Sequence, residues 1–280
     1  MSEWPPGASS TASAVLAAAL DSGVEAGPPN RLTELRDLID RLGAAGEAPL
    51  AAWLTGEAAG GQAVAITDRI GRAARLLAPD GAAPTTGSSA GVWQALAWTL
   101  DRLHGSGVRA IGRVPFLSVE LFEGLCDEAR AARPAQATGA RRVTGDAGDV
   151  LAAVAVSREL RETVSDALGF NAIPTYQALY EYDGPGSFVA PHVDARDYPF
   201  VFHLLLDHTR AEDAAQSVLI AYGPESSIPQ RISLSAMDAV VLNGRGTLHC
   251  WERLGMDEQR TLVAIGFARN RDQGSGIGDP

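Results

Sequence analysis

Three side chains that could hold one metal ion lie in the C-terminal third of the chain. His192 and Asp194 form a His-Val-Asp tripeptide, and His249 follows Asp194 by 55 residues. On an extended strand, residues two apart point to the same side, so His192 and Asp194 can reach one ion. Two imidazoles and one carboxylate with three open positions make the facial arrangement that suits non-haem iron(II). The spacing therefore predicts a metal site built from these residues.

A guanidinium follows the second histidine at a useful distance. Arg260 comes eleven residues after His249 and opens the apolar run RTLVAIGFAR. The planar guanidinium can hold a carboxylate with two parallel hydrogen bonds. A His-x-Asp tripeptide alone is a weak signal, but the ordered set within one β-rich segment favours a metal site with a carboxylate-binding group nearby.

The segment that must position these residues has the pattern of short strands. Runs rich in aromatic and β-branched residues alternate with Gly, Pro, Asp and Asn turns, which is typical of a barrel or a double-sheet jelly roll. The expected strands are 175–182, 188–192, 200–206, 217–222, 230–234, 239–242, 247–251 and 261–268.

The first half of the chain has helical periodicity instead. Apolar residues spaced three and four apart predict helices over 31–42, 62–78, 91–104, 118–132 and 149–168, with a Pro- and Gly-containing linker over 78–90. The expected fold class is α+β, a C-terminal double-stranded β-helix (a cupin-like jelly roll) buttressed by N-terminal helices. We expect a flexible arm over 1–30, a helical region over 31–169, a catalytic core over 170–270 and a tail over 271–280.

Composition excludes several classes of protein. The net charge is −11 and all 23 basic residues are arginine, which argues against nucleic acid as a partner and excludes a lysine Schiff base or a P-loop lysine. Two cysteines cannot build a disulfide scaffold or a four-thiolate zinc site. The N-terminus lacks the basic region of a signal peptide and a span-length apolar run, so we expect a cytoplasmic protein without a membrane partner.

The stretches YDGPGSFVAPHVD and NGRGTLHCWERLGMDEQRTLVAIGF resemble a known family. Residues 175–268 are similar to the double-stranded β-helix core of the Fe(II)/2-oxoglutarate-dependent dioxygenases, nearest to amino-acid hydroxylases and their halogenase relatives. The resemblance implies Fe(II), 2-oxoglutarate and O2 as cofactor and co-substrates, with His192, Asp194 and His249 as iron ligands. It implies Arg260 as the anchor of the C5 carboxylate of oxoglutarate. Halogenating members have Gly or Ala in place of Asp194, so its presence favours hydroxylation, with desaturation, epoxidation or cyclisation left open.

Other polar and aromatic residues near the motif are candidates for binding roles. Tyr180 and Thr247 are candidates for contacting oxoglutarate; Arg196, Tyr182, Phe188 and Trp251 are candidates for contacting the substrate. Core packing is an equally good reading of the aromatic residues. We expect His203 to be a buried histidine in the core or behind the site, and His208 to lie in a surface turn.

The expected function is oxygenation of an unactivated C–H bond in a small polar metabolite, an amino acid or derivative, with release of succinate and CO2. Three alternatives stay open. The oxygenase could act on a protein or a carrier-bound substrate, the jelly roll could bind or sense a metal without oxygenase turnover, or the same ligands could serve a zinc hydrolase.

Overall fold

The computed structural model describes a core that begins near residue 104. The described residues are 67, 68, 70, 71, 74, 75, 78, 93, 96, 97, 100, 101, 104–134, 142–210, 216–226 and 228–270. The helix expected over 31–42 and the arm and tail lie outside them. Within 62–78 and 91–104 the described residues are helical except Ala78.

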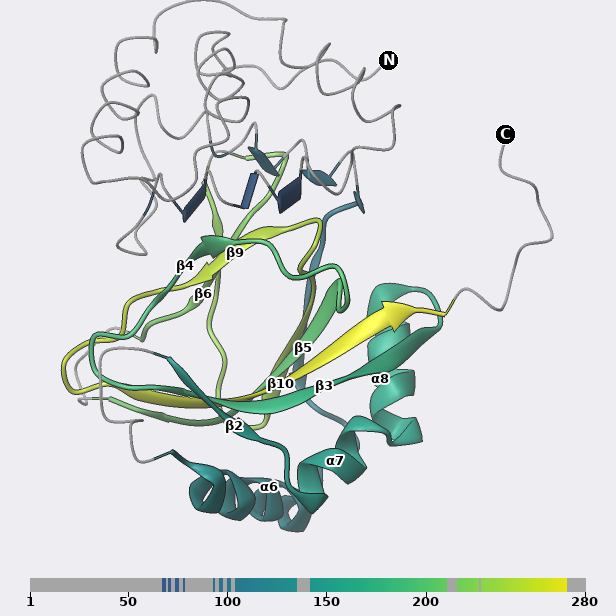
Figure 1. The fold of residues 1–280 in the computed structure, drawn as a ribbon, viewed down its shortest axis with the longest axis vertical. Coiled ribbons are helices and arrows are strands. Elements are labelled where there is room, and N and C mark those ends of the chain that lie inside the picture. The colour runs from purple at the N-terminus through teal and green to yellow at the C-terminus, as the bar shows by residue number, and fades with distance from the viewer. Residues whose placement is uncertain are drawn as a thin grey trace, which may run out of the picture.

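Two antiparallel sheets face each other (Figure 1). The larger sheet contains, in spatial order, β1 (Val108–Arg113), β8 (Asp238–Asn243), β5 (Phe200–Thr209), β10 (Gln259–Arg269), β3 (Ala172–Asp183) and β2 (Val143–Asp146). The smaller sheet contains β4 (Val189–His192), β9 (Leu248–Trp251), β6 (Leu219–Tyr222) and β7 (Gln230–Ile232). This order is that of a double-stranded β-helix, and the expected fold class is confirmed.

All eight strands expected from the alternation are present, and two more join them. β1 pairs with β8, and β2 pairs with β3, so both extend the larger sheet at its edges. The sheet thus includes strands that precede residue 170, in a region expected to be helical. β1 bends at a register shift beside Gly112, whose φ is +67°, and β2 is only four residues long. Strands this short and irregular have little periodicity of their own.

Three helices, α6 (Val119–Ala132), α7 (Asp149–Ala155) and α8 (Arg158–Leu168), cover the outer face of the larger sheet (Figure 1). The prediction of a single helix over 149–168 is wrong, because the helical structure is interrupted between α7 and α8. Ser157 there has extended backbone angles, and its hydroxyl accepts a hydrogen bond from the Leu160 amide, which begins a new helix.

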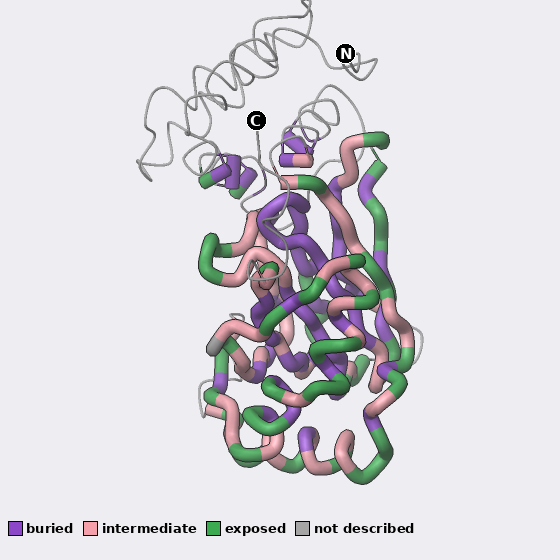
Figure 2. The backbone as a smooth tube through the Cα atoms, turned by 90° about the vertical axis from the view of Figure 1, so that its right-hand side faces the viewer, coloured by how far each residue is buried: buried purple, intermediate pink, exposed green. Residues whose placement is uncertain are grey.

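The buried residues form two apolar layers, one on each side of the larger sheet. One layer joins the sheet to the helices and contains Tyr180, Tyr182 and Phe202. The other lies between the two sheets and contains Leu242, Trp251 and Leu262. Figure 2 shows the buried backbone concentrated in these strands. Both faces of the central strands are therefore covered, which is why their burial is nearly continuous along β5 and β8.

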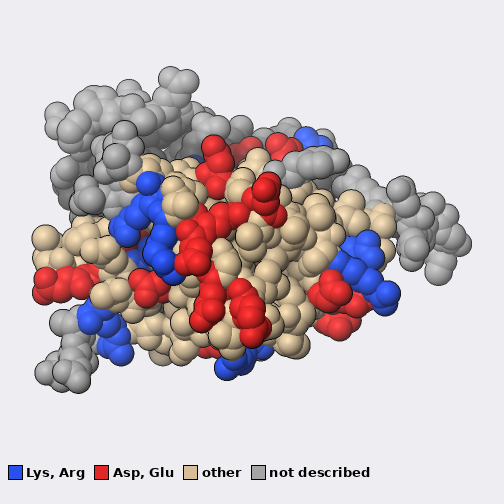
Figure 3. All heavy atoms as spheres, turned by 90° about the horizontal axis from the view of Figure 1, so that it is seen from below, with Lys and Arg blue, Asp and Glu red and all other residues tan. Residues whose placement is uncertain are grey.

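The surface that carries α6 is acidic. Glu120, Glu123 and Asp127 of this helix are exposed, and Figure 3 shows acidic side chains gathered across the face of the molecule seen from below. Among the described residues, none of the helices is both long and apolar enough to cross a membrane.

Candidate metal centre

The pairing of β4 with β9 brings the two histidines of the motif together. His192 and His249 lie directly opposite each other in the antiparallel register. Asp194 follows β4, and its backbone N–H donates to the carbonyl of Gly244 at 2.8 Å. Metal-ligating atoms of the three side chains all lie within 4.8 Å of one another. This triad is the one group of metal-ligand type found among the described residues.

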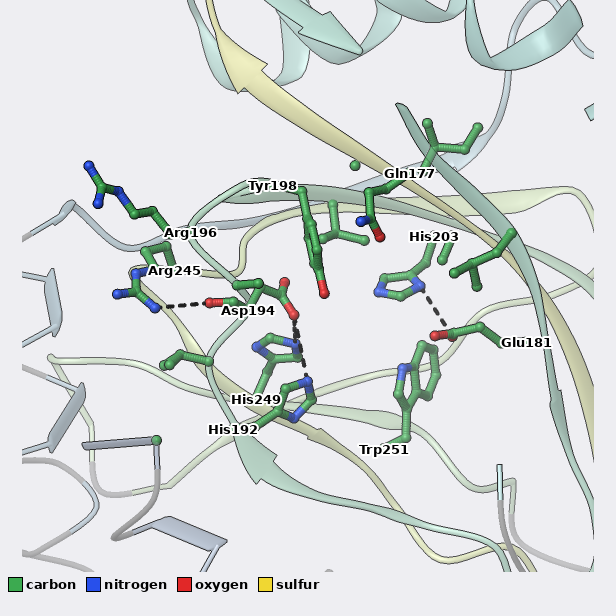
Figure 4. A pocket seen from close by; sticks show the side chains of 18 of the residues that line it. Gln177, Glu181, His192, Asp194, Arg196, Tyr198, His203, Arg245, His249 and Trp251 are labelled. Atoms are coloured by element: carbon green, nitrogen blue, oxygen red, sulfur yellow. Dashed lines mark hydrogen bonds and ion pairs between the residues drawn. The ribbon is translucent and has the colours of Figure 1, made fainter. Parts of the chain in front are cut away.

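The imidazoles are oriented by backbone carbonyl groups. Nδ1 of His192 lies 3.0 Å from the Ala190 carbonyl, and Nδ1 of His249 lies 2.8 Å from the Thr247 carbonyl. Because a carbonyl oxygen can only accept, each Nδ1 carries the proton and each Nε2 presents its lone pair. The two Nε2 atoms lie 3.6 and 3.7 Å from Oδ1 of Asp194. Two lone pairs and a carboxylate thus converge on one point (Figure 4).

The environment of the triad suits a metal ion. Oδ2 of Asp194 is buried and has no hydrogen-bond partner, a state that costs free energy unless a cation satisfies it. Burial lowers the pKa of His249 to about 4, which keeps its imidazole neutral and able to ligate. Burial opposes ionisation of Asp194, but the neighbouring histidines hold the pKa of its carboxyl below the usual value. The residues present therefore fit a divalent metal.

A cavity of about 680 Å³ opens beside the triad between the two sheets. Its walls carry charged side chains of both signs, including Asp68, Arg75, Arg196 and Arg245. Arg245 donates to the carboxylate of Asp68 at 2.8 Å. Tyr198 projects between Asp194 and Gln177 (Figure 4). A space of this size with a few polar groups is typical of a small-molecule site.

A buried group of charges lies at the inner end of the cavity. We call Arg142, Glu181, Asp183, Arg260 and His203 the inner charge cluster. Asp183 accepts hydrogen bonds from both guanidiniums, at 2.8 Å from Arg142 and at 2.7 Å from Arg260. Of the five, Arg142, Glu181 and His203 line the cavity. Burial lowers the pKa of His203 to about 3, so this imidazole is neutral near pH 7.

The structure places Arg260 inside the barrel but behind an aromatic wall. Its guanidinium carbon lies 4.1 Å from the ring centroid of Trp251, which itself lines the cavity. One of its nitrogens, Nη1, is buried without a hydrogen-bond partner. A donor atom is thus left over for a carboxylate, although Arg260 does not line the cavity in this structure.

The two tyrosines expected to contact oxoglutarate and the substrate do not line the cavity, because of the direction in which β3 runs. Tyr180 and Tyr182 point towards the helices, where their hydroxyls donate to Glu128 at 2.7 Å and to the Ala129 carbonyl at 2.6 Å. Because side chains alternate along a strand, the residues that face the cavity are Gln177, Leu179 and Glu181.

The remaining expected residues divide between the cavity and its surroundings. Arg196 and Trp251 line the cavity, with Arg196 exposed. Thr247 does not; its buried hydroxyl accepts from the Gly107 amide at 3.0 Å. Phe188 packs instead under the guanidinium of Arg253, 4.0 Å from the ring centroid.

Two histidines outside the triad differ in how well they follow expectation. His203 is buried, and it also faces the cavity. His208 was expected at the surface but is largely buried, because Glu258 binds its Nε2 at 2.6 Å at the end of β5.

The sequence did not point to several polar residues that line the cavity: Asp68, Arg75, Arg142, Glu181 and Tyr198. Glu181 stands between two tyrosines that drew attention to the other face of the strand. Arg142 precedes a strand that was not expected, so no local signal connected it with the motif. The period of two along β3 was the one signal that could have pointed to Glu181.

The fold and the site together define a double-stranded β-helix that carries a His-x-Asp…His triad of metal-ligand type. No protein-family model and no curated protein matches the chain. Among solved structures, it resembles a prolyl-4-hydroxylase from Pseudomonas putida, with 19% identity over 62% of this chain and 98% of that chain and a TM-score of 0.43.

Two further solved structures are also similar to the chain. The non-haem α-ketoglutarate-dependent epimerase SnoN of nogalamycin biosynthesis is 17% identical, covering 65% of this chain and 91% of that chain, with a TM-score of 0.46. HygX from Streptomyces hygroscopicus, solved with nickel, 2-oxoglutarate and hygromycin B, is 12% identical over 59% of this chain and 84% of that chain, with a TM-score of 0.47.

Proposed function

We propose that this protein is a non-haem Fe(II)/2-oxoglutarate-dependent oxygenase. The observation that carries the proposal is the convergence of two imidazole Nε2 atoms and one carboxylate at the cavity, with guanidiniums deeper in the same barrel. His192, Asp194 and His249 would hold the iron. When bound, iron with oxoglutarate and O2 supplies an oxidant for an unactivated C–H bond and releases succinate and CO2.

The chain's own residues would orient the reactants and exclude water. The carbonyl groups that bind the two Nδ1 atoms fix the imidazole planes before any ligand arrives. The inner charge cluster offers guanidinium donors to a carboxylate. Trp251 and residues of the larger sheet line the cavity beside the triad, and they would shield that side of the site from bulk solvent.

We propose a small polar metabolite, an amino acid or derivative, as the substrate. Support comes from the cavity itself, because Asp68, Arg75 and Arg196 place charges of both signs along its wall. A zwitterion carries one group for each sign. Hydroxylation is the proposed outcome, since Asp194 occupies the coordination position that a halide would need.

Anaerobic titration tests the proposal. Fe(II) and oxoglutarate added together should produce a weak visible charge-transfer band in the wild-type protein and none in the His249→Ala variant. Oxygen should then give succinate, and a screen of free amino acids and derivatives should identify compounds that accelerate its formation. Absence of the band together with absence of oxoglutarate-dependent O2 uptake would overturn the proposal, whereas metal binding alone would indicate a sensor or a hydrolase.

A further inference from the structure

The inner charge cluster is balanced before any co-substrate enters. It contains two guanidiniums, Arg142 and Arg260, and two carboxylates, Glu181 and Asp183, while His203 is neutral near pH 7. With both carboxylates ionised, the net charge is zero. A further carboxylate would leave an uncompensated negative charge inside the barrel, which is costly in a buried site.

Asp183 cannot easily be protonated to offset this additional negative charge. It is fully buried and accepts four hydrogen bonds, two from Arg142 and two from Arg260. Burial opposes its ionisation, but the two guanidiniums, Arg142 first, lower the pKa of Asp183 to about 2. Asp183 therefore stays ionised at any pH at which the protein would function.

Glu181 is held far more weakly. Its Oε2 lies 2.9 Å from Nη1 of Arg142 in an ion pair but accepts no well-aligned hydrogen bond. The same atom lies 3.8 Å from Nδ1 of His203, which also lacks a partner. Both side chains line the cavity and point towards each other beside Trp251 (Figure 4). Of the ionised groups in the inner charge cluster, Glu181 is therefore the one most easily protonated.

We propose that Glu181 takes up a proton from solvent, and that its ion pair with Arg142 breaks, when the distal carboxylate of oxoglutarate enters. The incoming carboxylate then pairs with the guanidinium that already faces the cavity, and the protonated Glu181 can donate a hydrogen bond to it. One proton enters with one carboxylate, so the charge of the barrel interior is unchanged. Glu181 is a positioning residue in this scheme, and the inference rests on the proposed use of oxoglutarate.

The surroundings of Glu181 are consistent with proton uptake. Burial raises the pKa of its carboxyl, Arg142 and Arg260 oppose this, and Asp183 and Asp194 add to it. These groups, with His203 and Tyr198, are the charged and titratable side chains that face Glu181 from the segment before β2, from β3, β5 and β10, and from the loop after β4. Ionised Glu181 also competes with the co-substrate for Arg142. Affinity for oxoglutarate should therefore fall as pH rises.

Calorimetry of oxoglutarate binding to the anaerobic Fe(II)-loaded protein measures this linkage. Titrations at pH 8 in two buffers of different ionisation enthalpy should show uptake of about one proton, the value that the charge count requires. The affinity of the wild-type protein should fall by up to about tenfold per pH unit where Glu181 is ionised before binding and protonated after it.

The Glu181→Gln variant keeps the shape of the side chain and removes its titratable carboxyl group. It should bind oxoglutarate at pH 8 at least about tenfold more tightly than the wild-type protein and take up almost no proton. Glu162→Gln is the matched control, because Glu162 pairs with Arg158 on the exposed surface of α8. It should behave as the wild-type protein does.

The outcomes separate the two proposals. Oxoglutarate binding without proton uptake by the wild-type protein overturns the role of Glu181 and leaves the oxygenase proposal standing. Equal proton uptake by Glu181→Gln has the same meaning, since the proton would then go elsewhere. If the wild-type protein binds iron but no oxoglutarate between pH 6 and pH 8, the proposed function itself is overturned.

Discussion

Replacing Gly244 with alanine should weaken metal binding severely while leaving the fold intact. A Cβ at this position would lie 2.9 Å from Cβ of Asp194 and would overlap its carboxylate carbon and Oδ2. Gly244 does not have a positive φ, so alanine can adopt its backbone conformation. The carboxylate must therefore move, and restoring ordinary contact distances requires a shift on the order of 1–2 Å.

A shift of that size is large for a metal ligand. Metal–ligand distances tolerate about 0.2 Å, so Asp194 would leave the coordination sphere. Changes to groups that merely orient a ligand cost about 10–100-fold in metal affinity, and loss of the ligand itself should cost at least the upper value. We expect Gly244→Ala to weaken Fe(II) binding by at least about 100-fold, or about 2.7 kcal/mol.

Anaerobic competition titration with a chromophoric chelator measures the metal affinity, and thermal unfolding without metal measures the fold. Gly223→Ala is the control, because a Cβ at Gly223 meets no atom within 4 Å. The control should match the wild-type protein in both measurements. Wild-type metal affinity in Gly244→Ala would refute the placement of Asp194 as a ligand, and an equal loss in Gly223→Ala would show that the effect is not local.

Three further substitutions test the surroundings of the site. Tyr180→Phe should lower the free energy of unfolding by about 1 kcal/mol, because the hydroxyl donates to Glu128; oxoglutarate affinity should not change, and a large change would place the tyrosine in the cavity after all. Glu258→Gln should cost about 1.5–3 kcal/mol in chemical denaturation, since Ser217 donates to this carboxylate from both its amide and its hydroxyl. Burial raises the pKa of Glu258, but these hydrogen bonds hold the pKa lower overall. The stabilisation by ionised Glu258 is therefore complete above the pKa of the unfolded state and is lost as pH falls through the pKa of the folded state. The variant lacks this ionisation, so it should lose less stability in acid than the wild-type protein. An acid sensitivity equal to that of the wild-type protein would contradict this sign. Arg196→Ala should raise the KM for the organic substrate roughly fivefold at unchanged oxoglutarate affinity, as expected for loss of about 1 kcal/mol from an exposed charge; an effect on oxoglutarate alone would reassign the residue.

Much of the core fold could be read from local patterns. Each strand of the two sheets between residues 172 and 269 was expected, because alternation and turn residues act within a few positions. The edge strands β1 and β2 were not expected. β1 contains a glycine kink and β2 has only four residues, so each forms a strand only because it pairs with a neighbouring strand. The break before α8 depends on one serine cap, which a continuous apolar stripe conceals.

The candidate triad was also accessible from the sequence, for a physical reason. His192 and Asp194 share a face of a strand by the period of two, and the residue types themselves prescribe the metal chemistry. That His249 lies opposite His192 required the register of β4 with β9. The sequence could nominate His249 by spacing alone.

The sequence by itself thus determined the strand-rich core, the chemical types of the metal-ligand candidates and the classes that an acidic chain without lysine excludes. Only the tertiary structure decided which face of β3 lines the cavity, and that Arg142 and Arg260 both donate hydrogen bonds to Asp183. It also decided that Glu181 is held by an ion pair with Arg142. The reason is that alternation specifies two faces without saying which is inside when both are buried. Pairings such as Arg142 with Asp183, 41 residues apart, arise only when strands distant in sequence take their register.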